Sequence, residues 1–118
     1  MSTTATTPMA IETHDRRVIE MHPAVAAALD SGADLIMVSR PVCVQCKSTE
    51  RAAEKKGLTI TKVNAEDYPD MGEWVGNLTG VMAVPLVLNA HSPISEHWTG
   101  FRPDMLDYVA EQIKNTAA

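Results

Sequence analysis

Cysteine is scarce in this sequence: its 118 residues hold only two, Cys43 and Cys46. A fold that depends on several disulfides is therefore excluded, and a chain of this length can bury one core without such cross-links. A structural zinc site would need two further ligands. Only His91 and His97 have a suitable spacing, but they follow the cysteines at a long distance, across a predicted loop, which argues against zinc.

Long apolar runs and dense basic stretches are also lacking. No run approaches the roughly 20 apolar residues that cross a bilayer, and the polar start of the chain has no apolar segment of a secretion signal. The net charge is −5, and the Lys and Arg residues appear scattered rather than clustered on a phosphate-binding surface. We therefore expect a cytoplasmic protein that binds neither membranes nor nucleic acid. In a reducing compartment a permanent structural disulfide is not expected, and one this short would constrain the unfolded chain little.

What the sequence does contain, from residue 34 onward, is an alternation of strand-like and helix-like patterns. We expect strands at 34–39, 58–65, 84–90 and 96–100, and helices at 44–56, 68–78 and 102–115. Before them, Pro23 and Gly32 bound a short predicted helix. Residues 1 to about 17 are polar without periodicity and are expected to be disordered.

This order predicts an α/β protein with a small mixed four-stranded sheet flanked by helices. The strands and helices follow the order βαβαββα, and an extra helix precedes them. We divide the chain into an N-terminal extension, residues 1–33, and one domain, residues 34–118.

The two cysteines form a C-x-x-C motif where the first strand of the domain passes into its first helix. A thiolate attacks disulfides, and a helix N-terminus or nearby cations lower the pKa of a cysteine from its usual value of about 8.5. Cys43 lies at the start of the helix, with Arg40 and Lys47 close in sequence. We expect Cys43 to be the attacking thiol and Cys46, one turn later, to be the resolving thiol.

A C-x-x-C motif beside a βαβ pattern favours a thioredoxin-like fold and redox site over a staple or a metal centre. A second element is Val84-Pro85, at the start of the third predicted strand. In a thioredoxin-like fold such a proline is cis and faces the attacking sulfur, and the backbone before it pairs with an extended substrate. Taken alone, these two residues fit an ordinary strand-starting proline equally well.

Together with a third segment, these motifs make residues 34–114 resemble the NrdH-redoxins, small glutaredoxin-like proteins that behave functionally like thioredoxins. The matching pieces are Cys43-Val44-Gln45-Cys46, Val84-Pro85 and Trp98-Thr99-Gly100-Phe101-Arg102-Pro103. The resemblance implies that Cys43 is the nucleophile and Cys46 the resolving thiol. It assigns substrate contacts to the other matched residues: Arg40, Val44, Gln45, Val84, Pro85, Trp98, Thr99, Gly100, Phe101 and Arg102. For residues 98–103, structural bracing without substrate contact is an equally good interpretation.

The resemblance also implies partners. Glutaredoxins proper carry a glutathione-contacting T-G-G-x-x-D segment in the region of residues 98–103, and this chain does not. The implied reductant is therefore a thioredoxin-reductase-like flavoenzyme that uses NADPH, and the implied electron acceptor is the tail of the large subunit of a class Ib ribonucleotide reductase. We expect a monomer without bound metal or cofactor, whose redox-active group is the Cys43–Cys46 disulfide. Two alternatives stay open: a glutathione-dependent glutaredoxin, and a non-catalytic interaction module with the N-terminal extension as its docking arm.

Overall fold

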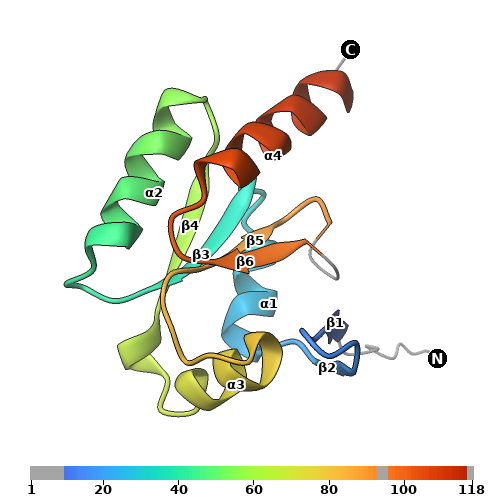
Figure 1. The fold of residues 1–118 in the computed structure, drawn as a ribbon, viewed down its shortest axis with the longest axis vertical. Coiled ribbons are helices and arrows are strands. Elements are labelled where there is room, and N and C mark those ends of the chain that lie inside the picture. Colours follow the sequence, from blue (N-terminus) through green and yellow to red (C-terminus); the bar gives the residue numbers. More distant parts are fainter. Residues whose placement is uncertain (1–9, 93–95, 117–118) are drawn as a thin grey trace.

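The computed structural model describes residues 10–92 and 96–116, which form a sheet with helices on both faces and a small N-terminal hairpin (Figure 1). In chain order the elements are β1 (Ala10–Glu12), β2 (Val18–Glu20), α1 (Pro23–Leu29), β3 (Leu35–Ser39), α2 (Val44–Lys55), β4 (Ile60–Asn64), η1 (Ala65–Asp67), α3 (Met71–Thr79), β5 (Leu86–Asn89), β6 (His97–Thr99) and α4 (Pro103–Thr116). Within this part of the chain no helix is both long and apolar enough to cross a membrane.

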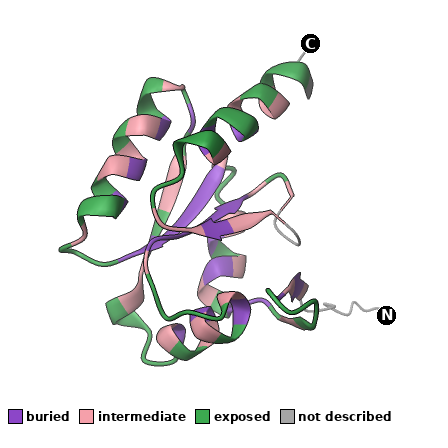
Figure 2. Ribbon diagram, in the orientation of Figure 1, coloured by how far each residue is buried: buried purple, intermediate pink, exposed green. Residues whose placement is uncertain are grey.

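The main sheet has the strand order β4-β3-β5-β6. β4 runs parallel to β3, β5 runs antiparallel to β3, and β6 runs antiparallel to β5. All five residues of the central strand β3 are buried, because helices cover the sheet on both sides (Figure 2). This double burial explains why the sequence of β3 is an apolar run rather than an alternating pattern.

The two faces of the sheet belong to two separate core clusters. Residues of β3 that point to one face, Ile36 and Val38, pack with residues of α1 and α3. The residues between and beside them, Leu35 and Met37, pack on the other face with residues of α2 and α4. This second cluster includes Cys46, so the redox motif is anchored directly in the core.

The predicted order of strands and helices from residue 34 onward is confirmed, with differences of a few residues at the ends. The helix predicted at residues 68–78 begins only at Met71, because η1 and Pro69 precede it. The third predicted strand begins at Leu86, after the Val84-Pro85 peptide, which is cis. The extra helix before the sheet is also present as α1.

The expectation of disorder up to about residue 17 is wrong for the residues that the structure describes there; residues 1–9 lie outside them. β1 and β2 pair as an antiparallel hairpin. Its turn is held by hydrogen bonds from the Thr13 N–H to the Arg17 carbonyl (2.7 Å) and from the Arg17 N–H to the Thr13 hydroxyl (3.0 Å). Strands of three residues with a single buried side chain, Ile11, are too short to show a periodic pattern in the sequence.

The N-terminal extension packs onto α3 through specific contacts. The Trp74 indole N–H donates to the Glu20 carbonyl (2.9 Å). His22 caps α1 by accepting the Ala24 N–H on Nδ1 (3.0 Å), so its Nε2 carries the proton and donates to Asp70 (3.0 Å). Ile11, Met21 and Val25 from this segment belong to the same core cluster as Ile36. The division at residue 33 stays a prediction, but the extension is an integral part of this core.

Asp34 joins three strands just before β3 begins. Its carboxylate accepts from the Thr59 N–H (3.0 Å) and hydroxyl (3.1 Å), and His91 Nε2 lies 3.1 Å from it, while its carbonyl accepts the Ala90 N–H (2.9 Å). Partial burial alone would raise the pKa of Asp34. The hydrogen bonds from Thr59 and His91 outweigh burial, and the pKa is lowered from 3.8.

A pH-dependent contribution of Asp34 to stability follows. A carboxyl whose pKa is depressed in the folded state stabilises the fold above its unfolded pKa, and this is lost as the pH falls through the folded value. Asp34→Asn should lower the free energy of unfolding by about 1–2 kcal/mol at neutral pH, since hydrogen bonds to a charged group are lost. The difference from wild type should shrink below the usual carboxyl pKa of 3.8. Urea unfolding of the wild type and of Asp34→Asn at neutral and acidic pH measures this difference in the free energy of unfolding. The same difference at both pH values would contradict a stabilising role of the ionised Asp34 carboxylate.

Candidate functional site

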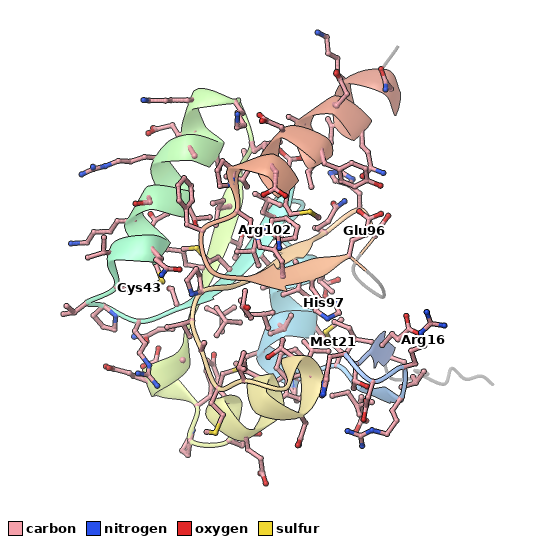
Figure 3. The ribbon with its side chains drawn as sticks, viewed as in Figure 1. Arg16, Met21, Cys43, Glu96, His97 and Arg102 are labelled. Carbon is pink, nitrogen blue, oxygen red and sulfur yellow. A yellow bond between two sulfur atoms is a disulfide. The ribbon has the colours of Figure 1, made fainter. Side chains whose placement is uncertain are left out.

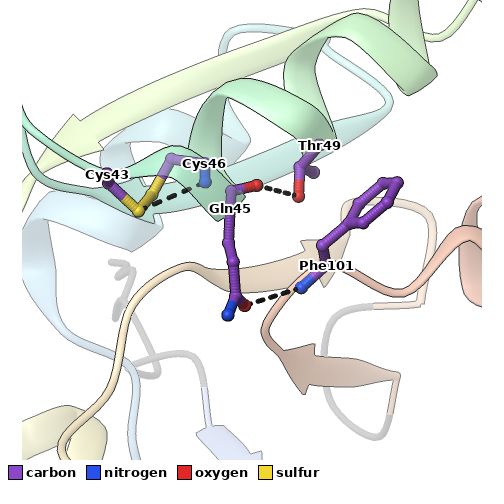
Figure 4. The surroundings of a disulfide bond; sticks show 5 residues. All are labelled: Cys43, Gln45, Cys46, Thr49 and Phe101. Atoms are coloured by element: carbon purple, nitrogen blue, oxygen red, sulfur yellow. Dashed lines mark hydrogen bonds between the residues drawn. A yellow bond between two sulfur atoms is a disulfide. The ribbon is translucent and has the colours of Figure 1, made fainter.

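The C-x-x-C motif lies between the carboxyl end of β3 and the first turn of α2. Cys43 is the N-cap of α2, with extended backbone, and its Sγ accepts the Cys46 N–H (3.2 Å; Figure 4). Cys43 and Cys46 form a disulfide with their Cα atoms 5.2 Å apart. The first turn of the helix thus brings the two sulfurs together. It also directs the Cys46 N–H, which has no partner within the helix, at the Cys43 sulfur.

The two cysteines differ in accessibility. Cys46 is 2% exposed and packs in the core with residues of α2 and α4. Cys43 is only partly buried, and its neighbours Val42 and Val44 are 93% and 79% exposed. A partner can therefore reach Cys43 but not Cys46, as the predicted roles of attacking and resolving thiol require.

The Val84-Pro85 corner lies beside this turn. Its peptide is cis, in agreement with the expectation for a thioredoxin-like fold. Val84 and Cys43 pack against the same core cluster, and Pro85 is buried. The Pro85 carbonyl accepts the Gly100 N–H (2.8 Å), which ties the corner to the loop between β6 and α4.

That loop in turn contacts the C-x-x-C motif. The Phe101 N–H donates to the Gln45 side-chain oxygen (3.1 Å; Figure 4). Gly100 has a φ of 82°, and a Cβ at this position would lie 3.0 Å from the same oxygen. Both the backbone conformation and the close approach therefore favour glycine. Gln45, Gly100 and Pro85 form a continuous connection between the disulfide turn and the cis-proline corner.

The remaining residues predicted to contact substrate differ in exposure. Trp98 is 5% exposed and packs in the core cluster that contains Cys46, and Thr99 is partly buried. The others reach the surface and comprise Arg40, Val44, Gln45, Phe101 and Arg102. Arg102 is paired with Asp104 (2.8 Å), and this pair raises the pKa of the arginine and lowers that of the carboxyl. Their contact with a substrate stays a prediction.

One open groove contains the disulfide, and a second adjoins it at Arg40. The first, here the α2 groove, has a volume of about 250 Å³ and is lined by both cysteines, Arg40, Lys47 and Lys62. The second, here the α3 groove, has a volume of about 390 Å³ and is lined mainly by η1, α3 and residues 82–84. Arg40 lines both grooves, so it lies between them.

Lys62 and Tyr68, which line these grooves, were not among the predicted site residues. A signal for Lys62 was present in the sequence. Two strands joined by a helix in a βαβ pattern pair in parallel, and parallel strands end at the same edge of a sheet. The register pairs Ser39 with Asn64, so residues near the end of β4 necessarily lie beside the C-x-x-C turn.

Among residues 10–92 and 96–116 no group of three or more His, Cys, Asp or Glu side chains is arranged to hold a metal ion. Of the two candidate histidines, His91 contacts Asp34 and His97 lies on β6. The cysteines are bonded to each other.

Comparison with known proteins gives the family. A model of the glutaredoxin family matches residues 35–90. The glutaredoxin-like protein NrdH of Salmonella typhimurium is 33% identical over 73 residues, which cover 62% of this chain and 84% of that protein. The corresponding Escherichia coli protein is 32% identical with the same coverage. The chain belongs to the glutaredoxin-like NrdH family.

Solved structures agree with this family assignment. The NrdH-redoxin of Escherichia coli, a protein described as having a thioredoxin-like activity profile, is 31% identical, with a TM-score of 0.54 and coverage of 63% of this chain and 91% of that one. A glutaredoxin from Archaeoglobus fulgidus, 19% identical, shows the same fold with a TM-score of 0.54 over 69% of this chain and 89% of that one. The thioredoxin-like fold predicted from the sequence is therefore confirmed.

Membership in the glutaredoxin-like NrdH family makes this protein a thiol-disulfide oxidoreductase. Its C-x-x-C motif forms the Cys43–Cys46 disulfide. Thiol-disulfide exchange of this kind uses the protein's own sulfurs.

Proposed function

We propose that this redoxin is the dithiol electron donor of a class Ib ribonucleotide reductase and is recharged by a thioredoxin-reductase-like flavoenzyme. The observation that carries the proposal is the pairing of an accessible Cys43 with a buried Cys46 at the N-terminus of α2. Membership in the NrdH family, together with the family's thioredoxin-like relative, supports the choice of partners.

Cys43 and Cys46 would carry out the reduction in two exchanges. The Cys43 thiolate attacks one sulfur of the substrate disulfide, forms a mixed disulfide and releases the first substrate thiolate. The Cys46 thiolate then attacks Cys43 Sγ, closes the internal disulfide and releases the second substrate thiolate. Two electrons pass from the redoxin to the substrate, and two protons complete its thiols. The hydrogen bond from the Cys46 N–H to Cys43 Sγ and the N-terminus of α2 favour the thiolate form of Cys43.

The cis-proline corner would seat the substrate chain. Val84 makes no backbone hydrogen bond to another described residue, although Val84 and Cys43 pack against the same core cluster. An extended segment on either side of the substrate disulfide could pair with these free backbone groups. The connection through Gln45 and Gly100 would hold the corner and the disulfide turn at a fixed separation.

The loop between β6 and α4 supports thioredoxin reductase over glutathione as the source of electrons. In this loop the Phe101 N–H is already engaged by Gln45, and Arg102 is paired with Asp104. Residues 99–104 thus differ from a T-G-G-x-x-D segment at Phe101, and the Phe101 N–H and the Asp104 carboxylate are engaged within the protein.

The choice of reductant can be measured directly. The oxidised protein is incubated with NADPH and either thioredoxin reductase, or glutathione and glutathione reductase, and NADPH consumption is followed with a protein disulfide as acceptor. We expect turnover with thioredoxin reductase to be faster by at least about ten-fold, a difference of roughly 1.4 kcal/mol in the activation barrier. Turnover with glutathione alone would make the protein a glutathione-dependent glutaredoxin. Turnover with neither would favour a non-catalytic interaction module.

A further inference from the structure

Charge is unevenly distributed around the disulfide. Six of the ten Lys and Arg residues fall between residues 40 and 62, which hold only two of the fifteen Asp and Glu residues. The next stretch, residues 65–80, holds four acidic residues and no basic one. The basic residues are therefore concentrated in the segment from the end of β3 to β4, which contains the C-x-x-C motif, in a protein whose net charge is −5.

The fold places three of these cations around the α2 groove. Arg40 follows β3, Lys47 belongs to the first turns of α2, and Lys62 comes from the neighbouring parallel strand β4. All three line the groove that contains both cysteines. Among the described residues Arg40 and Lys47 have no ion-pair partner, whereas Lys62 forms a solvent-exposed pair with Glu50 (3.3 Å), which also lines the groove. Three cations face one carboxylate, so the groove beside the disulfide keeps a net positive charge.

The opposite flank carries the opposite sign. Glu66 and Asp67 belong to η1, Asp70 is the N-cap of α3 and pairs with His22, and Glu73 lies in the first turn of α3. Of these four residues Glu66 lines the α3 groove, together with Arg40. Cys43 lies at the base of α2, with α3 on the other side of the turn (Figure 3). A segment that crosses Cys43 would therefore meet a basic surface at one end and an acidic surface at the other.

We propose that the α2 groove docks an acidic segment of the protein substrate, next to the disulfide that Cys43 attacks. This inference rests on the proposed dithiol exchange and adds the chemistry of the partner. Opposite charges attract within the Debye length, about 8 Å at physiological salt, so a groove directly beside Cys43 acts on the residues that flank the reacting sulfur. The acidic η1–α3 flank repels the same segment, so the two flanks together set its direction across the site.

The test uses a matched pair of peptides. Both contain the same intramolecular disulfide, flanked by two Asp residues in one and by two Asn residues in the other. The wild type should have a kcat/KM for the acidic peptide about five- to ten-fold higher than for the neutral one, a preference that decreases with added salt. Lys47→Gln combined with Lys62→Gln should remove most of this preference. Arg17→Gln combined with Lys114→Gln removes the same charge from exposed positions on other elements and should retain it.

Two further measurements keep the outcomes distinguishable. Reduction of the uncharged hydroxyethyl disulfide reports on dithiol exchange alone, and its absence in the wild type would contradict the proposed function. Docking without chemistry is measured by titration calorimetry. Each peptide is used in a form in which both of its own cysteines are replaced by serine. Equal binding of acidic and neutral peptides, or an equal loss in the two double variants, would overturn the docking proposal even where hydroxyethyl disulfide is reduced.

Discussion

Replacing Cys43 by serine is expected to lower the rate of disulfide reduction by at least about 1,000-fold, because the hydroxyl cannot replace the thiolate as the attacking group. Cys43 is the cysteine that a partner can reach, and its Sγ is the one that accepts a helix N-terminal N–H. The buried Cys46 cannot take over the attack, since it is 2% exposed. The rate is measured with a protein disulfide and an excess of reductant.

Cys46→Ser should behave differently. The first exchange still occurs, but no second thiol is present to release the product, so a mixed disulfide between Cys43 and the substrate accumulates. Non-reducing electrophoresis and mass spectrometry identify this species and the sulfur that carries it. Circular dichroism of both variants controls for loss of fold. A stable mixed disulfide in Cys43→Ser, but not in Cys46→Ser, would show that the roles of the two cysteines are exchanged.

The second large effect concerns stability and the N-terminal hairpin. Ile11→Ala should lower the free energy of unfolding by about 2–5 kcal/mol, the range for truncating a fully buried Ile to Ala. Ile11 is 0% exposed and packs in the cluster that also contains Leu78 and Leu88, residues of α3 and β5. Urea unfolding followed by fluorescence of Trp74 and Trp98 measures the change.

The matched control comes from the other strand of the same hairpin. Val18 is 66% exposed, so Val18→Ala should change the free energy of unfolding by less than about 0.5 kcal/mol. Similar small effects of both substitutions would mean that the hairpin does not contribute to the core. A large effect of Val18→Ala would mean that its side chain is covered in solution.

The main sheet could be predicted because its signals are local. The apolar run of β3, the helix that follows Cys43 and the amphipathic pattern of α4 each lie within one short window of sequence. The hairpin formed by β1 and β2 could not be predicted in this way. It contributes one buried apolar side chain, Ile11, which packs in a cluster with Val25 and Leu78, far from it in the sequence. Its turn depends on a hydrogen bond to the side chain of Thr13, which is also buried.

The candidate site was predictable to the extent that its residues are adjacent in sequence. The C-x-x-C motif and the Val84-Pro85 pair can each be recognised in the sequence, because each has a known role in disulfide exchange. The connection from Gln45 to Phe101 has no such signal, because it depends on the position of one side-chain oxygen relative to a loop backbone. The same holds for the α2 groove. Lys62 becomes part of the redox centre only through the parallel pairing of β4 with β3.

The placement of the hairpin has a practical consequence for attaching this protein to another. Arg16 in the hairpin turn and Cys43 lie at opposite margins of the molecule, and the last turn of α4 also points away from the disulfide (Figures 1 and 3). A label, a solid support or a fused domain joined at the hairpin or after α4 would therefore leave the approach to Cys43 open. We expect the redoxin immobilised at the hairpin turn or at the last turn of α4 to exchange electrons with large partners still.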